Sequence, residues 1–277
     1  MIEVKSIERL EKYSLHIEEV PIKVWKFPTG EVGFKFLEPG KIKPSGATYE
    51  VNCKFESNDD IFAALQAIDA LKILGVEIGK IILRVPYLPY SRQDRVCHPG
   101  ESFALQVLAS VLNTTGVDIH TLDVHSDVAM QEIPTLSNTE QFECVWNSLP
   151  HFDYFIAPDK GSHNKAKDIL PVQDDGSNLV TLSKERIGST IKYMDYEYDS
   201  IKGSACIVDD LCDGGGTFLA CAEMLRRTQP NLTELSLYIT HGFFTAGIDK
   251  LKEKFDNIYV CNLMSKDINV INFVKGI

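Results

Sequence analysis

The sequence has little of what marks secreted, membrane or nucleic-acid-binding proteins. Its seven cysteines include no C-x-x-C pair and are odd in number, so we expect reduced residues of a cytoplasmic protein rather than a disulfide framework or a zinc site. No apolar run approaches the ~20 residues of a membrane span, and the N-terminus has no signal-peptide core. The net charge of −11 argues against a nucleic-acid partner. Anionic nucleotides stay open as ligands, because magnesium and backbone N–H groups offset negative charge.

The chain alternates segments of strand and helix character, with no low-complexity tract and no short-period repeat. A hairpin is expected around residues 28–31, with arms at 23–27 and 32–36. Further strands are expected at 80–85, 118–123, 154–157, 178–182, 204–208 and 234–239, and helices at 58–74, 102–112, 163–169, 218–227 and 246–254. This order predicts an α/β protein of two similar halves, residues 1–140 and 141–277, each a mainly parallel sheet flanked by helices.

The segment from Cys206 to Phe218 is the most informative in the chain. Residues 204–208 have the composition of a buried strand, and Asp209 and Asp210 stand where that strand is expected to end. A glycine-rich turn and a helix follow, an arrangement that directs free backbone N–H groups at a phosphate. The turn consists of Asp213, Gly214, Gly215, Gly216 and Thr217. The paired carboxylates suit ribose hydroxyls or a magnesium ion, and the alternative is a tight turn with two solvated acids.

This segment resembles the phosphoribosyl pyrophosphate loop that type I phosphoribosyltransferases share with ribose-phosphate pyrophosphokinases. Other motifs resemble the pyrophosphokinases alone and occur in the order typical of that family. They are Phe27-Pro-Thr-Gly-Glu31, Arg92-Gln-Asp-Arg95, Asp123-Val-His125, Ala157-Pro-Asp159, Lys184-Glu-Arg186 and Ile239-Thr-His-Gly-Phe243. The resemblance covers roughly residues 22–262 and implies two phosphoribosyltransferase-like halves.

The resemblance also implies a reaction, in which the β,γ-diphosphate of ATP moves to the C1 hydroxyl of ribose 5-phosphate and AMP is released. Lys184, Arg186 and His125 would be catalytic, and His125 and Asp159 would lie at a Mg²⁺ ion. The segment Asp209 to Thr217 would bind the ribose 5-phosphate. The family's ATP site matches Phe27, Glu31, Arg92, Gln93 and Asp94.

A homo-oligomer with a shared nucleotide site is implied as well, because the family's hairpin reaches the adenine of a neighbouring subunit. We expect the nucleotide between Phe27, Arg92 and His125. Three of the candidate features also have a plain structural interpretation. A Lys-Glu-Arg triplet is often a solvated surface, a histidine after a strand is often structural, and Phe27 suits the core of a hairpin.

Several positions depart from the family pattern. Gly214 replaces a threonine of the phosphate loop, which removes a hydroxyl donor and makes room for a phosphate that carries a substituent. Glu185 replaces an arginine, Thr29 an aspartate, residues 96–101 a basic stretch, and the first strand–helix unit is missing. A larger acceptor such as ADP-ribose, as in NAD metabolism, is therefore the main alternative. A non-catalytic subunit is disfavoured by the retained Lys184 and His125, and a phosphoribosyltransferase by Arg92 to Arg95.

Overall fold

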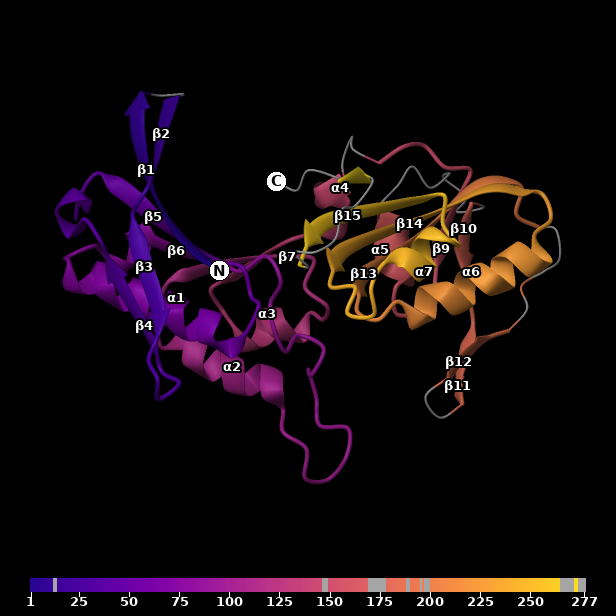
Figure 1. Cartoon of the computed structure of the whole chain (residues 1–277), viewed down its shortest axis with the longest axis horizontal. Coiled ribbons are helices and arrows are strands. Elements are labelled where there is room, and N and C mark those ends of the chain that lie inside the picture. The colour runs from indigo at the N-terminus through magenta and orange to yellow at the C-terminus, as the bar shows by residue number, and fades with distance from the viewer. Residues whose placement is uncertain are drawn as a thin grey trace. The chain divides into compact units, whose positions relative to one another are not determined.

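The computed structural model describes residues 1–11, 14–145, 149–168, 178–187, 190–194, 196, 200–264 and 272–273 (Figure 1). The chain divides into two compact units, Met1–Thr139 and Glu140–Ile277. The functions that the sequence analysis assigned to residues 1–140 and 141–277 stay predictions. No helix in the described part of the chain is long and apolar enough to cross a membrane.

The first unit is built on a sheet of six described strands in the order β2-β1-β5-β6-β7-β8. The strands β5 to β8 run parallel, and β1 pairs antiparallel with both β2 and β5. Their bounds are β1 (Ile2–Glu11), β2 (Ser14–Glu19), β5 (Ala47–Cys53), β6 (Ile81–Arg84), β7 (Asp118–Leu122) and β8 (Leu136–Thr139). The helices are α1 (Asn58–Ile73), α2 (Ala104–Asn113) and α3 (Val128–Glu132), with 3₁₀ turns η1 (Pro39–Lys41) and η2 (Ile78–Lys80).

Local sequence explains the elements of this unit that were predicted. The expected hairpin forms as β3 (Ile22–Lys26) and β4 (Val32–Phe36). Helix α1 begins at Asn58, as expected, behind the cap residue Ser57, whose backbone N–H donates to Asp60 at 2.8 Å. Alternate residues of β5 are buried, so one face of this strand enters the core. The sequence analysis did not identify β1, β2, β5 or β8.

The second unit is built on a parallel sheet of six described strands in the order β10-β9-β13-β14-β15-β16. Their bounds are β9 (Tyr154–Ala157), β10 (Leu179–Thr181), β13 (Gly203–Cys212), β14 (Leu232–Gly242), β15 (Asn257–Leu263) and β16 (Asn272–Phe273). The helices are α4 (Gln141–Val145), α5 (His163–Asp168), α6 (Gly216–Thr228) and α7 (Asp249–Lys252). A separate hairpin, β11 (Lys184–Ile187) and β12 (Thr190–Tyr193), projects from the sheet near α6 (Figure 1).

The predicted fold class is confirmed, since both units are α/β with mainly parallel sheets flanked by helices. Two of the boundaries that differ from expectation lie next to the candidate site. Strand β13 continues through Asp209 and Asp210 to Cys212, because it keeps pairing with β14 up to Gly242. The last predicted helix, residues 246–254, is limited to Asp249–Lys252, and its expected first turn is interrupted at Gly247, whose φ angle is 81°.

Candidate functional site

The acid pair lies near the carboxyl end of β13, with β9 on one side and β14 on the other. The backbone N–H of Asp210 donates to Oδ1 of Asp209 at 3.0 Å. The side-chain amide of Gln141 donates to the backbone carbonyl of Asp209 at 2.7 Å and to the Thr240 hydroxyl at 3.0 Å. The backbone of the acid pair is therefore anchored to α4 and β14, as a fixed pair of ligands requires.

The two acids of the pair differ in their surroundings. Although Asp209 keeps some accessible surface, burial of its carboxyl raises the pKa well above the ordinary value, and the adjacent Asp210 raises it further. The buried Asp210 carboxylate has the ammonium of Lys165 at 3.7 Å. Without a cation or a ligand at Asp209, the pair does not readily hold two negative charges.

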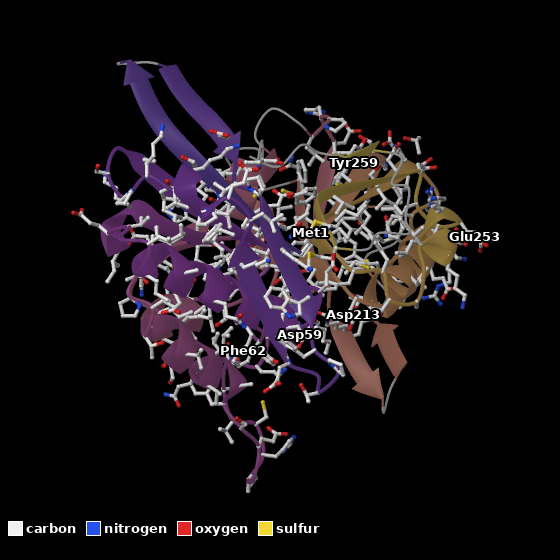
Figure 2. All side chains as sticks on the ribbon, turned by 60° about the vertical axis from the view of Figure 1, so that its left-hand side comes forward. Met1, Asp59, Phe62, Asp213, Glu253 and Tyr259 are labelled. Carbon is white, nitrogen blue, oxygen red and sulfur yellow. The ribbon has the colours of Figure 1, made fainter. Side chains whose placement is uncertain are left out.

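The glycine-rich turn joins β13 to α6 directly. Gly215 is the cap of α6 and has a φ of 80°, where a Cβ would lie 3.2 Å from the side chain of Leu251. Asp213, labelled in Figure 2, accepts a hydrogen bond from the Thr245 hydroxyl at 2.6 Å, which ties the turn to the loop after β14. The first backbone N–H groups of α6 have no partner within the helix, so the turn can bind an anion such as phosphate.

Gly214 has open space where a side chain would stand. A Cβ added there would meet only Thr245 Oγ1 at 3.8 Å and the Ala246 Cβ at 3.9 Å, which are ordinary contacts. Its φ angle lies outside the left-handed region, so side chains are allowed. Glycine at this position is therefore required neither by backbone conformation nor by close packing.

Lys184 begins the β11–β12 hairpin, and its ammonium lies 2.5 Å from Oδ2 of Asp159, just after β9. The other oxygen of Asp159 accepts backbone N–H groups from Gly161 at 2.8 Å and Ser162 at 3.1 Å. Burial raises the pKa of Asp159, but the hydrogen bond and charge of Lys184, with these N–H donors, outweigh it and leave the pKa below its usual value. Asp159 is thus held as an anion that already binds one cation.

In the first unit, the predicted nucleotide segment after β6 lies beside the predicted His125 loop. Arg92, Gln93 and His125 are exposed. Asp94 is buried, accepts two hydrogen bonds of 2.8 Å from Arg95 and another from Ser126, and its pKa is lowered to about 2, chiefly by Arg95. The Asp94 carboxylate therefore fixes this segment against the loop and leaves Arg92 and Gln93 directed to solvent.

The hairpin residues Phe27 and Glu31 lie at the tip of β3–β4. Phe27 is 45% exposed and contacts Trp25 edge to face, so the structure gives it no core role. The Glu31 carboxylate accepts the Thr29 hydroxyl at 2.7 Å. Lys26 pairs with Asp59, labelled in Figure 2, at 2.6 Å, which ties the hairpin to the start of α1.

The start of α1 also holds the segment after β6, because the Tyr90 hydroxyl donates to Asn58 at 2.7 Å. The structure therefore connects Phe27 to the Arg92 segment through α1, and the Arg92 segment to His125 through Asp94. In the second unit it brings Lys184 to Asp159. The side chain of Arg186 lies outside the described residues.

The chain is similar to known proteins in sequence and in fold. A family model for the N-terminal domain of ribose phosphate pyrophosphokinase matches residues 7–116. The ribose-phosphate pyrophosphokinase of Pyrococcus furiosus is 30% identical over 281 residues, which cover 99% of this chain and 96% of the relative. The chain belongs to the ribose-phosphate pyrophosphokinase family. The enzyme of Pyrococcus abyssi is 28% identical over 273 residues, covering 96% of this chain and 92% of the relative.

A solved structure supports the fold of this pyrophosphokinase family member. The phosphoribosylpyrophosphate synthetase of Mycobacterium smegmatis matches with a TM-score of 0.73 at 20% identity, over 92% of this chain and 85% of that chain. The relatives confirm the predicted family and enzyme class, and the solved structure confirms the fold. The roles of the individual residues stay predictions.

Lys165 is a residue of this family member that the sequence analysis missed. It lies on α5, which follows β9, and β9 is the neighbour of β13. A cation early in that helix can reach acids at the carboxyl end of the next strand. The signal was therefore its place in the first turn of the segment after Asp159 that was predicted to be helical, residues 163–169.

The chain's own ligands suit a magnesium ion that is shared with a substrate. The described residues contain no group of three or more His, Cys, Asp or Glu side chains placed to hold a metal. Mg²⁺ commonly takes only one or two protein carboxylates together with substrate phosphates. Asp159 fits this use, since its Oδ2 already accepts a cation, the Lys184 ammonium.

Proposed function

We propose that the protein is a Mg²⁺-dependent diphosphotransferase that moves the β,γ-diphosphate of ATP to the C1 hydroxyl of ribose 5-phosphate, giving phosphoribosyl pyrophosphate and AMP. The observation that carries the proposal is the sequence of groups around β13. An anchored acid pair is followed at once by a glycine turn and the N-terminus of α6, and the neighbouring β9 leads to the Lys184–Asp159 pair.

The acceptor fits this end of the second unit. A sugar 5-phosphate at residues 213–217 would receive backbone N–H groups and the favourable end of the α6 dipole. The 2- and 3-hydroxyls would then donate to Asp209 and Asp210, whose backbones are held in place. A sugar that occupies both sites is fixed at its two ends, which orients the C1 hydroxyl for reaction.

Chemistry occurs at the β-phosphorus. The C1 oxygen of the acceptor forms the new bond, the bond from the β-phosphorus to the α,β-bridging oxygen breaks, and AMP leaves with that oxygen. Negative charge grows on the phosphoryl oxygens, so cations placed beside them accelerate the reaction. Lys184 would supply such a charge after leaving Asp159, and Arg186 of the same hairpin and His125 would add to it.

A magnesium ion, held by Asp159 and His125 together with the phosphates, would supply charge neutralisation to the triphosphate. The ATP site would use Phe27 and Glu31 of the hairpin and the segment Arg92 to Asp94. Exposure of Phe27 and Arg92 leaves both available to a nucleotide. A homo-oligomer in the cytoplasm, with the hairpin completing a neighbour's nucleotide site, is part of this proposal.

The test is product analysis by mass spectrometry. The purified protein is incubated with ATP, Mg²⁺ and one ribosyl phosphate at a time, and AMP is measured together with the diphosphorylated product. We expect AMP and phosphoribosyl pyrophosphate in equal amounts with ribose 5-phosphate. AMP formed without a diphosphorylated partner would indicate hydrolysis, and no AMP with any acceptor would refute the proposal.

A second candidate keeps the chemistry and changes the acceptor to ADP-ribose. The observation in its favour is Gly214, where the nearest side-chain atoms stand 3.8 Å from the position of an added Cβ. The space left at the phosphate turn suits a 5-phosphate that carries a second group. The product would be ADP-ribose pyrophosphate, and the same mass measurement distinguishes it by its adenosine moiety.

A further inference from the structure

The hydroxyl of Tyr193 is a buried donor that no described residue pairs with. The residue is only 4% exposed, and its oxygen has no hydrogen-bond partner among the residues that the structure describes. Buried hydroxyls are normally hydrogen-bonded, because an unpaired one forfeits its bonds to water. An orphaned hydroxyl at this place therefore calls for an explanation.

Its position connects it with the proposed acceptor site. Tyr193 ends β12 and stands directly across the hairpin from Lys184. Its ring belongs to the core cluster that includes Phe218 and Cys221 of α6, the helix that follows the glycine turn. The charges of Asp159 and Asp209 also act on the phenol. The ring thus packs with the core beside α6, and the phenol is near enough to Asp159 and Asp209 for their charges to affect its pKa.

The phenol acts as a neutral donor. Burial raises the pKa of Tyr193 far above its usual value, and the nearby Cys221, Asp159 and Asp209 raise it further. Across the physiological pH range the group therefore keeps its proton. It is unsuited to act as a base, but it can donate one hydrogen bond to an oxygen that carries negative charge.

Asp209 is the acid that lacks such a donor. Among the described residues, its carboxyl receives one hydrogen bond, from the backbone N–H of Asp210. An enclosed carboxylate needs several donors to remain charged, and only a charged carboxylate offers all its lone pairs to ribose hydroxyls. Tyr193 packs in the same core cluster as Ile207, which stands two residues before Asp209 on β13, so the unpaired hydroxyl and the acid belong to one part of the second unit.

We infer that Tyr193 is a positioning residue of the acceptor site, whose hydroxyl donates to the Asp209 carboxylate when a ribosyl phosphate binds. The inference rests on the proposed function. It implies that acceptor binding gives the unpaired Tyr193 hydroxyl an acceptor and gives the Asp209 carboxylate a donor besides the backbone N–H of Asp210. Tyr193 then contributes to binding the acceptor without touching it, and it does so from the same hairpin that carries Lys184.

The test is Tyr193→Phe, which removes the hydroxyl and keeps the ring in the core. We expect the KM for ribose 5-phosphate to rise about tenfold, the equivalent of one hydrogen bond to a charged group, while the KM for ATP changes by less than about twofold. Calorimetric titration with ribose 5-phosphate alone should show the same loss of affinity. The binding measurement also separates this inference from the proposed function, because it does not depend on turnover.

Two comparison variants make the result specific. Tyr259→Phe removes the hydroxyl of a tyrosine on β15. Figure 2 shows Tyr259 well away from Asp213, so this variant should leave acceptor binding unchanged. Asp209→Asn serves for a double-mutant cycle, in which the effect of Tyr193→Phe should largely disappear if Tyr193 acts through Asp209. The cycle also remains informative if either single variant loses stability, because thermal unfolding of each protein is recorded alongside.

A purely structural role gives a different outcome. If the orphaned hydroxyl is only a packing defect, Tyr193→Phe will raise the melting temperature and leave both the acceptor KM and the calorimetric affinity within about twofold of wild type. That outcome overturns the inference. Equal losses in the wild-type and Asp209→Asn backgrounds overturn it as well, because Tyr193 would then act independently of Asp209.

Discussion

In the first unit the candidate nucleotide contacts stand on exposed loops, whereas in the second unit the candidate acceptor acids lie on a central strand. Arg92 and Phe27 face solvent, and the charged group beside them, Asp94, is satisfied by Arg95. Asp209 instead carries an enclosed carboxyl on β13, with a pKa raised by burial and by Asp210. The comparison indicates that substitutions at the exposed contacts of the first unit can change function without changing stability. In the second unit, the enclosed Asp209 carboxyl that function requires lowers stability when it is charged.

The largest expected effect is the loss of Lys184. Lys184→Ala should lower kcat by on the order of 10³ and change the KM for ATP little, because the ammonium is needed most when charge develops at the β-phosphorus. Arg186→Ala should act in the same direction. Steady-state kinetics measures both.

Lys254→Ala is the matched control for Lys184, since that lysine pairs with Glu223 on the surface of the same unit. It should retain wild-type turnover. Near-normal turnover of both hairpin variants would show that the hairpin does not supply the catalytic charge, and the second unit would then be a binding surface.

A smaller effect is expected at Gly214. Threonine fits there without a backbone clash and adds a hydroxyl donor for a terminal phosphate. Gly214→Thr should lower the KM for ribose 5-phosphate by up to about tenfold and selectively impair an acceptor with a substituted phosphate. Comparing kcat/KM for ribose 5-phosphate and ADP-ribose in both proteins measures this. A wild-type preference for ADP-ribose would reverse the order of the two proposed functions.

The opposition of function and stability in the second unit is tested by pH. The folded pKa of Asp209 is raised, so its contribution to the free energy of unfolding is fully present below the pKa of an unfolded aspartate and is lost as pH rises through the folded value. Asp209→Asn removes that loss, and should raise the denaturant midpoint at pH 7 while weakening, but not abolishing, acceptor binding. Each pKa unit corresponds to about 1.4 kcal/mol.

The pH series gives this prediction an internal check. The difference in midpoint between wild type and Asp209→Asn should grow from about pH 4 upward. Asp159 has the opposite sign, because its lowered pKa stabilises the fold above the usual aspartate pKa and that stabilisation is lost on acidification. A difference in midpoint that is constant with pH would mean that folding does not raise the pKa of Asp209.

Sequence patterns located the hairpin, α1 and β9 well, because turn residues and hydrophobic periodicity act locally. They placed the end of β13 too early, because adjacent acids indicate a strand end unless a neighbouring strand continues to pair, as β14 does. They did not identify Lys165 or Tyr193, whose importance arises from strand order and helix packing. The motifs predicted which groups belong to a site. The charge states and hydrogen-bond partners of those groups depend on tertiary neighbours, which local sequence patterns do not reveal.

The smallest expected effect on stability concerns Phe27, and it tests whether the first unit separates function from stability. The ring is 45% exposed and contacts Trp25, so Phe27→Ala should reduce the free energy of unfolding by no more than about 0.5 kcal/mol. If the ring stacks on adenine, the KM for ATP should rise several-fold while the KM for the acceptor stays constant. Val24→Ala, also exposed on the hairpin, is the control and should change neither KM.

A large loss of stability in Phe27→Ala would assign the ring to hairpin packing. An unchanged KM for ATP would place the nucleotide away from the hairpin, and the first unit would then contribute through the Arg92 segment alone.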